Sequence, residues 1–149
     1  MSKIRSMKCI VRSIAAIPLA LAGSPLAAST PSETIVGRWL TDDGKGIVTI
    51  APCGSALCGR ISQVLDRSPG VPTTDVNNPD AALRKRGILG LPVLTGFRRV
   101  GNQWASGRAY DPKSGSSYRS RLALNADRSL RVTGCVLFIC QSKRWRRMP

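Results

Sequence analysis

Few residues of this sequence have side chains suited to acid–base or nucleophilic chemistry. The chain has no histidine, and Glu33 is its single glutamate. The Gly-x-Ser-x-Gly pattern of serine hydrolases does not occur. A carboxylate pair could be drawn from Asp75, Asp80 and Asp111, but Asp111 opens a Pro-containing turn and is more simply a turn former. We therefore expect a protein that is not an enzyme and needs no cofactor.

The polar stretch of residues 66 to 79 is the best candidate for ligand contacts, because ligands tend to contact long connections. Its Asp75-x-Asn77-x-x-Asp80 segment is similar to a calcium-binding loop, yet Asp80 stands where an EF-hand needs glycine and Arg86 where it needs glutamate. We expect no metal site. The alternative to ligand binding is that the asparagines only cap and turn the chain. The predicted ligand contacts are Asp75, Asn77, Asn78, Arg84, Arg108 and Tyr110.

Four cysteines follow residue 28, namely Cys53, Cys58, Cys135 and Cys140. An even number in an oxidising compartment indicates two disulfides, for which the sequence allows three pairings. A four-residue hairpin loop brings its flanking positions face to face, and this favours Cys53 with Cys58 and Cys135 with Cys140. Zinc sites use a tighter Cys-x-x-Cys spacing, so zinc is disfavoured.

Residues 1–28 have the pattern of a cleaved secretory signal peptide. Basic residues come first, an apolar segment over residues 9 to 23 follows, and Ala28 is the best candidate for the last residue removed. A membrane-spanning helix would need about 20 apolar residues, whereas this segment is shorter and contains Arg12 and Pro18. We expect a periplasmic or secreted protein, with a flexible linker at 29–35, one domain at 36–149 and no transmembrane segment in the mature chain.

The protein is strongly basic. Its formal net charge of +15 falls to about +11 without the signal peptide. A basic surface can bind nucleic acid, but export argues against that partner. In a cell envelope the available polyanions are phospholipid head groups, lipopolysaccharide phosphates and acidic polymers, and a cationic surface is attracted to each of them. The alternative is that the arginines only form a solvated surface.

The chain after residue 35 alternates between short apolar segments and turn residues, and no apolar helical stripe persists for three turns. One short helix is predicted at 81 to 86, with Asn78 as its cap and Pro79 in its first turn. The predicted strands cover residues 36 to 40, 46 to 51, 59 to 65, 92 to 100, 103 to 110, 116 to 124, 130 to 136 and 141 to 147.

The strand at 116 to 124 gives the clearest register. Tyr118, Leu122 and Leu124 share one face, and Arg119 and Arg121 lie on the other. Eight such strands in hairpin succession predict an all-β protein, a small antiparallel up-and-down barrel, because closure leaves no exposed edge. Such a barrel can fill its interior with side chains or hold one small ligand. A sandwich is the alternative architecture.

A series of motifs extends over nearly all of the mature chain, and it resembles the bacterial domain-of-unknown-function family 2147. The resemblance implies a small exported protein with a lipocalin-like barrel, and it implies no catalytic residues. The motifs are Gly37-x-Trp39, Pro52-Cys53-Gly54, Cys58-Gly59-x-Ile61, Asp75-x-Asn77-Asn78-Pro79-Asp80, Gly90-Leu91-Pro92, Gly107-x-x-Tyr110-Asp111-Pro112, Gly115-x-x-Tyr118 and Trp145-x-Arg147.

The Gly37-x-Trp39 motif also resembles the first-strand signature of lipocalins, in which a basic residue of the last strand packs over the tryptophan. Arg146 and Arg147 are the two candidates for that residue, and its role would be structural.

Two functions follow from these observations. The first is a non-enzymatic envelope protein that binds a small apolar or amphipathic anionic ligand inside the barrel. The second is a filled barrel whose basic exterior docks on anionic lipids, lipopolysaccharide or an envelope protein partner. The sequence does not determine the oligomeric state.

Overall fold

The computed structural model of the protein describes residues 34–149, so the predicted signal peptide lies outside the described residues. Eight strands and one short 3-10 helix form this part. The elements are β1 (Gly37–Leu40), β2 (Gly46–Cys53), β3 (Ala56–Val64), η1 (Ala81–Leu83), β4 (Pro92–Val100), β5 (Gln103–Asp111), β6 (Ser116–Leu124), β7 (Leu130–Val136) and β8 (Ile139–Met148).

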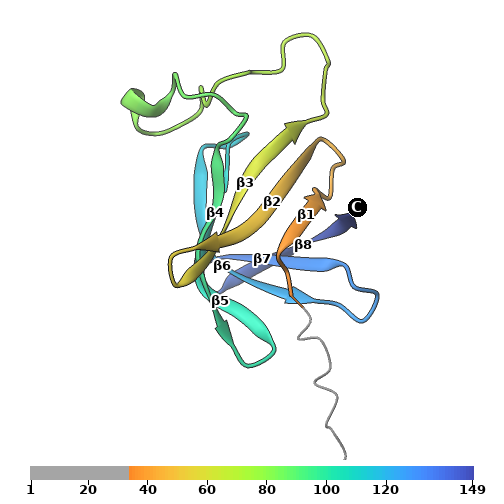
Figure 1. Ribbon diagram of the computed structural model, residues 1–149. Coiled ribbons are helices and arrows are strands. Elements are labelled where there is room, and N and C mark those ends of the chain that lie inside the picture. Colours follow the sequence, from red (N-terminus) through yellow and green to blue (C-terminus); the bar gives the residue numbers. More distant parts are fainter. Residues whose placement is uncertain (1–33) are drawn as a thin grey trace, which may run out of the picture. The chain divides into compact units, whose positions relative to one another are not determined.

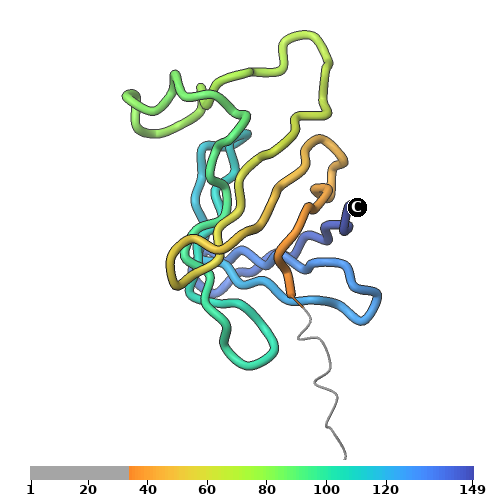
Figure 2. Tube along the Cα trace, in the orientation of Figure 1, coloured from red at the N-terminus to blue at the C-terminus, as the bar shows by residue number. Residues whose placement is uncertain are grey.

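The strands form a closed barrel in sequence order, and every strand is antiparallel to its neighbours. Figures 1 and 2 show this succession of hairpins, together with the long connection between β3 and β4. The barrel closes where β1 pairs with β8, with Trp39 opposite Arg147. Closure satisfies the backbone groups that an open sheet would leave at its two edges. The predicted up-and-down barrel is therefore confirmed.

A contiguous cluster of apolar side chains fills the interior. The inner surface is so crowded that two strand positions accept only glycine. A Cβ atom on Gly107 would lie 2.5 Å from the ring of Phe97, and one on Gly59 would lie 2.9 Å from Leu94 and Val48. The buried members of the cluster are Ile35, Trp39, Val48, Ile50, Leu91, Val93, Leu94, Phe97, Trp104, Leu122, Leu130, Val132 and Trp145.

Strand β6 has the register that its alternation predicts, with Leu122 buried and Arg119 and Arg121 exposed. Strand β5 does not keep a simple alternation. Its pairing with β6 shifts between Trp104 and Gly107, and Ser106 between them has a φ of 62°. This bulge inserts one residue and brings both Trp104 and Gly107 to the inner surface.

Both cysteine pairs are joined as disulfides, Cys53 with Cys58 and Cys135 with Cys140. The predicted four-residue loops between them are wrong, because strand pairing occupies part of each one: β2 ends at Cys53 and β3 already begins at Ala56, while β7 and β8 extend past Cys135 and Cys140 to Val136 and Ile139. The β2–β3 turn consists of residues 54 and 55, and the β7–β8 turn of residues 137 and 138. Cys135 and Cys140 are directly paired across β7 and β8.

The connection between β3 and β4, residues 65–91, differs from the prediction in its helix. Only Ala81–Leu83 form a 3-10 turn, and none of these three residues is buried. These apolar side chains are exposed, so the short helical segment gains little energy from packing. Asp80 caps the turn by accepting from the Ala82 N–H, and the Asn78 side chain instead accepts from the Asp80 N–H.

The structure places Arg147, rather than Arg146, over Trp39. The guanidinium carbon lies 4.3 Å from the centre of the indole ring. The same guanidinium donates to the carbonyls of Thr34 (2.6 Å) and Val36 (3.1 Å). Arg147 therefore ties the end of β8 to the segment that enters β1.

Replacing Arg147 with alanine should lower the free energy of unfolding by about 2 kcal/mol, because a cation–π contact and two charge-assisted hydrogen bonds are lost. Arg146 is exposed, and its replacement should change stability by less than about 0.5 kcal/mol. Denaturant midpoints of the two variants test this difference. Equal midpoints would show that the Trp39 contact does not stabilise the closed barrel.

Candidate functional site

Three of the six predicted ligand-contact residues, Asp75, Asn78 and Tyr110, lie in one cluster between the long connection and β5. Asp75 is fully buried. Its carboxylate accepts from the Tyr110 hydroxyl (2.6 Å), from the Asn78 amide (2.8 Å) and from Arg86, whose Nη2 lies 2.8 Å away. The Arg86 guanidinium also lies 5.5 Å from the centre of the Tyr110 ring. We call Asp75, Asn78, Arg86 and Tyr110 the Asp75 cluster.

The ionisation of Asp75 follows from these contacts. Burial alone would raise its pKa, but hydrogen bonds from Tyr110, Asn78 and Arg86 and the positive charge of Arg86 outweigh it and lower the pKa. The pKa of Tyr110 is raised by burial and by its hydrogen bond to the Asp75 carboxylate. At neutral pH the cluster is therefore a carboxylate held by a guanidinium, a phenol and an amide.

The backbone of the connection is organised around the same aspartate. The Asp75 N–H donates to the Arg86 carbonyl, and Thr74 pairs with Gly87 in an isolated bridge. The Arg84 Nε donates to the Asn78 carbonyl at 2.7 Å. These contacts fold residues 74–87 into a closed loop and fix its ends together.

Asn77 joins this loop to the β5–β6 turn. Its side-chain amide donates to the carbonyls of Pro112 (3.3 Å) and Lys113 (3.0 Å). Its own backbone lies against Gly115, where a Cβ atom would come within 1.9 Å of the Asn77 carbonyl oxygen. The Asp75 cluster and Asn77 thus attach the long connection to β5 and to the turn that follows it.

This arrangement supports a structural role more than a ligand-binding one. The Asp75 carboxylate accepts from three protein groups, and the asparagine side chains bond to Asp75, Tyr110 and the β5–β6 turn. Arg108 does not join the cluster. It lies exposed on β5, where it pairs with Thr95 and Arg119.

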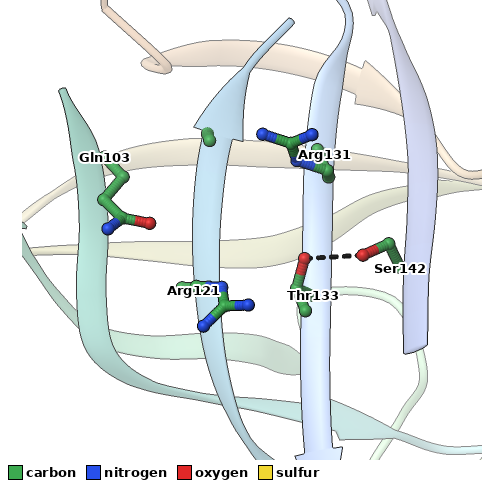
Figure 3. A pocket seen from close by; sticks show the side chains of 6 residues that line it. Gln103, Arg121, Arg131, Thr133 and Ser142 are labelled. Atoms are coloured by element: carbon green, nitrogen blue, oxygen red, sulfur yellow. Dashed lines mark hydrogen bonds between the residues drawn. The ribbon is translucent and has the colours of Figure 1, made fainter. Parts of the chain in front are cut away.

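A second polar site lies on the outer wall of the barrel, across strands β5 to β8 (Figure 3). It is a groove of about 310 Å³ that we call the outer groove. The hydroxyls of Thr133 and Ser142 form a hydrogen bond of 2.8 Å at one side, and Arg121 and Arg131 reach across it (Figure 3). The lining residues are Gln103, Arg121, Ala123, Arg131, Thr133 and Ser142.

The outer groove belongs to a larger basic surface. Arg121 is paired with Thr133 across β6 and β7, and Arg119, two residues earlier, is paired with Cys135 on one side and with Arg108 on the other. Side chains two residues apart in a strand share a face. We call Arg108, Arg119, Arg121 and Arg131 the arginine face. Within residues 34–149, none of the four forms an ion pair or a side-chain hydrogen bond.

Sequence reasoning assigned Arg108 to a ligand site but missed the outer groove. The available signal was the alternation of arginines with apolar residues in two successive strands, which places Arg121 and Arg131 on the outside. Arg86 was also missed as a functional partner of Asp75. The two residues are eleven positions apart, and only the folding of the connection brings them together.

The closed antiparallel barrel, with Arg147 of the last strand over Trp39 of the first, defines a lipocalin-like class of protein. The chain belongs to the bacterial family DUF2147, described as an uncharacterized protein conserved in bacteria, and the family profile matches residues 37–147. The family predicted from the motifs is therefore confirmed. No curated protein matches the sequence.

Among solved structures, the protein HP1028 from the human pathogen Helicobacter pylori, which belongs to the lipocalin family, has the same fold. Its TM-score is 0.69 at 22% sequence identity, and the match covers 78% of this chain and 84% of that chain. Two disulfides are consistent with an exported protein. In the described range, 34–149, no helix has the length and apolar character needed to cross a bilayer.

Proposed function

We propose that the protein is a non-enzymatic, exported barrel whose basic outer wall docks on phosphate-bearing lipid head groups of the cell envelope. The outer groove carries this proposal. Two arginines without acidic partners lie beside the paired hydroxyls of Thr133 and Ser142. Arginine binds phosphate oxygens through its planar fork of donors, and hydroxyls add further donors.

The charge balance supports an anionic partner of extended area. Lysines and arginines number 23 against 8 acidic residues in the whole chain. The described aspartates Asp43, Asp66, Asp75 and Asp127 are each held in ion pairs outside the arginine face. Each basic residue near an anionic membrane contributes about 1 kcal/mol to binding. The arginine face therefore supplies several such contributions on one side of the barrel.

A ligand inside the barrel is the second candidate function, and one observation favours it. The indole N–H of Trp145 is buried without a hydrogen-bond partner among residues 34–149. A buried donor of this kind costs free energy unless an acceptor reaches it. A small ligand could supply that acceptor, although the inner surface is already crowded by Phe97 and Leu94. Co-purification of a small molecule, detected by native mass spectrometry, would favour this interior site.

The docking proposal predicts that Arg121→Gln/Arg131→Gln weakens binding to anionic vesicles roughly tenfold to thirtyfold, because two contributions of about 1 kcal/mol are removed. Sedimentation with vesicles of phosphatidylglycerol and phosphatidylcholine measures the affinity. Binding of the native protein should fall steeply between 50 and 300 mM salt as the charges are screened.

The matched control is Arg67→Gln/Lys85→Gln. It removes the same charge from exposed residues of the long connection, away from the outer wall. Equal losses in the two double variants would show that net charge alone drives binding and that the outer groove has no special role. Absence of vesicle binding by the native protein, with capture of an envelope protein instead, would replace the lipid with a protein partner.

A further inference from the structure

The turn between β7 and β8 is the most exposed apolar feature of the described chain. Four consecutive side chains project there, and their exposed fractions are 56% for Val136, 90% for Leu137, 88% for Phe138 and 65% for Ile139. Most large apolar side chains of a small barrel are buried, and a contiguous exposed group marks an interaction site. We call residues 136–139 the apolar tip.

The apolar tip cannot fold back onto the barrel easily. The Cys135–Cys140 disulfide joins the two strands immediately before the tip, with Cα atoms 4.1 Å apart. The ladder of β7 with β8 continues through Val136 and Ile139. The cross-link and the ladder hold the tip as a narrow, preformed projection, so that little conformational entropy is lost when it meets a partner.

Positive charge lies directly behind the apolar tip. Arg119 is the cross-strand neighbour of Cys135, and Arg108 is the next residue in the same row. Arg121 follows two residues further from the tip, and Arg131 lies four residues before Cys135 on β7. The apolar tip is thus followed by the positively charged arginine face. This order matches the layers of an anionic bilayer, where acyl chains lie below charged head groups.

The dimensions agree with this order. A strand rises about 3.3 Å per residue, so Phe138 lies within roughly 10 Å of the row that contains Cys135 and Arg119. Interfacial segments bury their apolar side about 5 to 10 Å into the boundary between head groups and acyl chains. With the tip at that depth, Arg119 and Arg108 reach the head groups and the outer groove remains close to the surface charge.

We infer that the apolar tip inserts into the lipid layer and that the arginine face binds the anionic head groups around it. This inference rests on the proposed function and deepens it, because it makes a bilayer, rather than a soluble phosphate or an acidic polymer, the partner. Membrane contact then has an electrostatic part that salt weakens and an apolar part that salt leaves largely unchanged.

Tryptophan fluorescence reports the insertion directly in the full mature chain. The native tryptophans Trp39, Trp104 and Trp145 are all buried, so a Leu137→Trp variant adds a single exposed probe. On vesicles containing 30% phosphatidylglycerol, the added emission should shift to shorter wavelength and be quenched by brominated acyl chains. An unshifted, unquenched probe on vesicles that do bind the protein would overturn insertion.

A polar tip supplies the second test. Leu137→Ser/Phe138→Ser should weaken vesicle binding at least tenfold, because two side chains lose the gain of leaving water. It should leave unfolding unchanged, since both residues are almost fully exposed. The control is Val100→Ser. The exposed fraction of Val100, 54%, is similar to the 56% of Val136. Val100, however, precedes the β4–β5 turn, which lies at the opposite end of the up-and-down barrel from the apolar tip.

The outcomes separate the two proposals. If the polar tip variant binds as tightly as the native protein while Arg121→Gln/Arg131→Gln binds weakly, insertion is wrong and head-group docking stands. If both variants and the Leu137→Trp probe behave as expected, both proposals hold. A third outcome would exclude the bilayer as the partner. In it, the native protein and the polar tip variant both bind a soluble phosphorylated saccharide or an acidic polymer as tightly as they bind vesicles.

Discussion

Gly115→Ala should destabilise the barrel by about 3 kcal/mol or more, because the new methyl group meets backbone that cannot move alone. Gly115 has a φ of 70°, and its Cβ atom would lie 1.9 Å from the Asn77 carbonyl oxygen and 2.8 Å from the carbonyl carbon. Relief requires the long connection to leave the β5–β6 turn. We therefore expect a lower denaturant midpoint together with faster proteolysis within residues 65–91.

Gly44→Ala is the matched control. Gly44 also has a φ of 70°, but no atom lies within 4 Å of its Cβ position. Gly44→Ala should therefore lower the free energy of unfolding only by the strain of an alanine in the left-handed region, about 1 kcal/mol. It should not expose the long connection to protease. Similar losses in the two variants would contradict the close contact between Gly115 and Asn77.

Asp75→Ala should lower the free energy of unfolding by about 2 to 4 kcal/mol at neutral pH. The substitution leaves Arg86 without its counterion and removes the acceptor for Tyr110 and Asn78. The value lies below that of a fully buried pair because the Arg86 side chain is 33% exposed. Urea unfolding at pH 7 measures it, and Asp42→Ala, which breaks an exposed 3.4 Å pair with Lys143, should have a much smaller effect.

The stability difference between the native protein and Asp75→Ala should depend on pH. The pKa of Asp75 is lowered in the folded protein from a reference value of 3.8. A lowered pKa contributes stability that is fully present above the unfolded value and is lost as pH falls through the folded value. The difference in unfolding free energy between native protein and Asp75→Ala should be constant from pH 6 to 8 and should shrink below about pH 4. A difference that grows on acidification would reverse the assigned ionisation.

The barrel was predictable because its strands repeat a simple rule. In β6, Arg119 and Arg121 alternate with Ser120 and Leu122, and in β7 Arg131 lies between Leu130 and Val132, so the buried side and the register follow from the sequence. The same rule failed in β5, where the bulge at Ser106 brings Trp104 and Gly107 to one surface. A bulge depends on the neighbouring strand and leaves no mark in the alternation.

The candidate site was predictable only in part. Polar composition indicated Asp75, Asn77 and Asn78, because long connections carry such residues for turns and contacts. It could not indicate Arg86, whose charge is placed by the Thr74–Gly87 bridge. The helix prediction failed for a related reason.

Asn78 was expected to cap that helix. Its side-chain oxygen instead accepts from the Asp80 N–H while its side-chain N–H donates to Asp75 and Tyr110, and Asp80 caps the shorter turn. Local propensity is overridden where a tertiary partner offers a stronger contact.

The pairing of the first strand with the last has a consequence for how the chain is made. Strand β1 finds its second partner only at Arg146, Arg147 and Met148, in the last of the eight strands. During synthesis, β1 therefore pairs with β8 only after the other seven strands have been made, and the loop that must close is nearly as long as the domain. A protein that stopped before Arg146 would keep its hairpins and disulfides, yet it would remain an open sheet with two free edges.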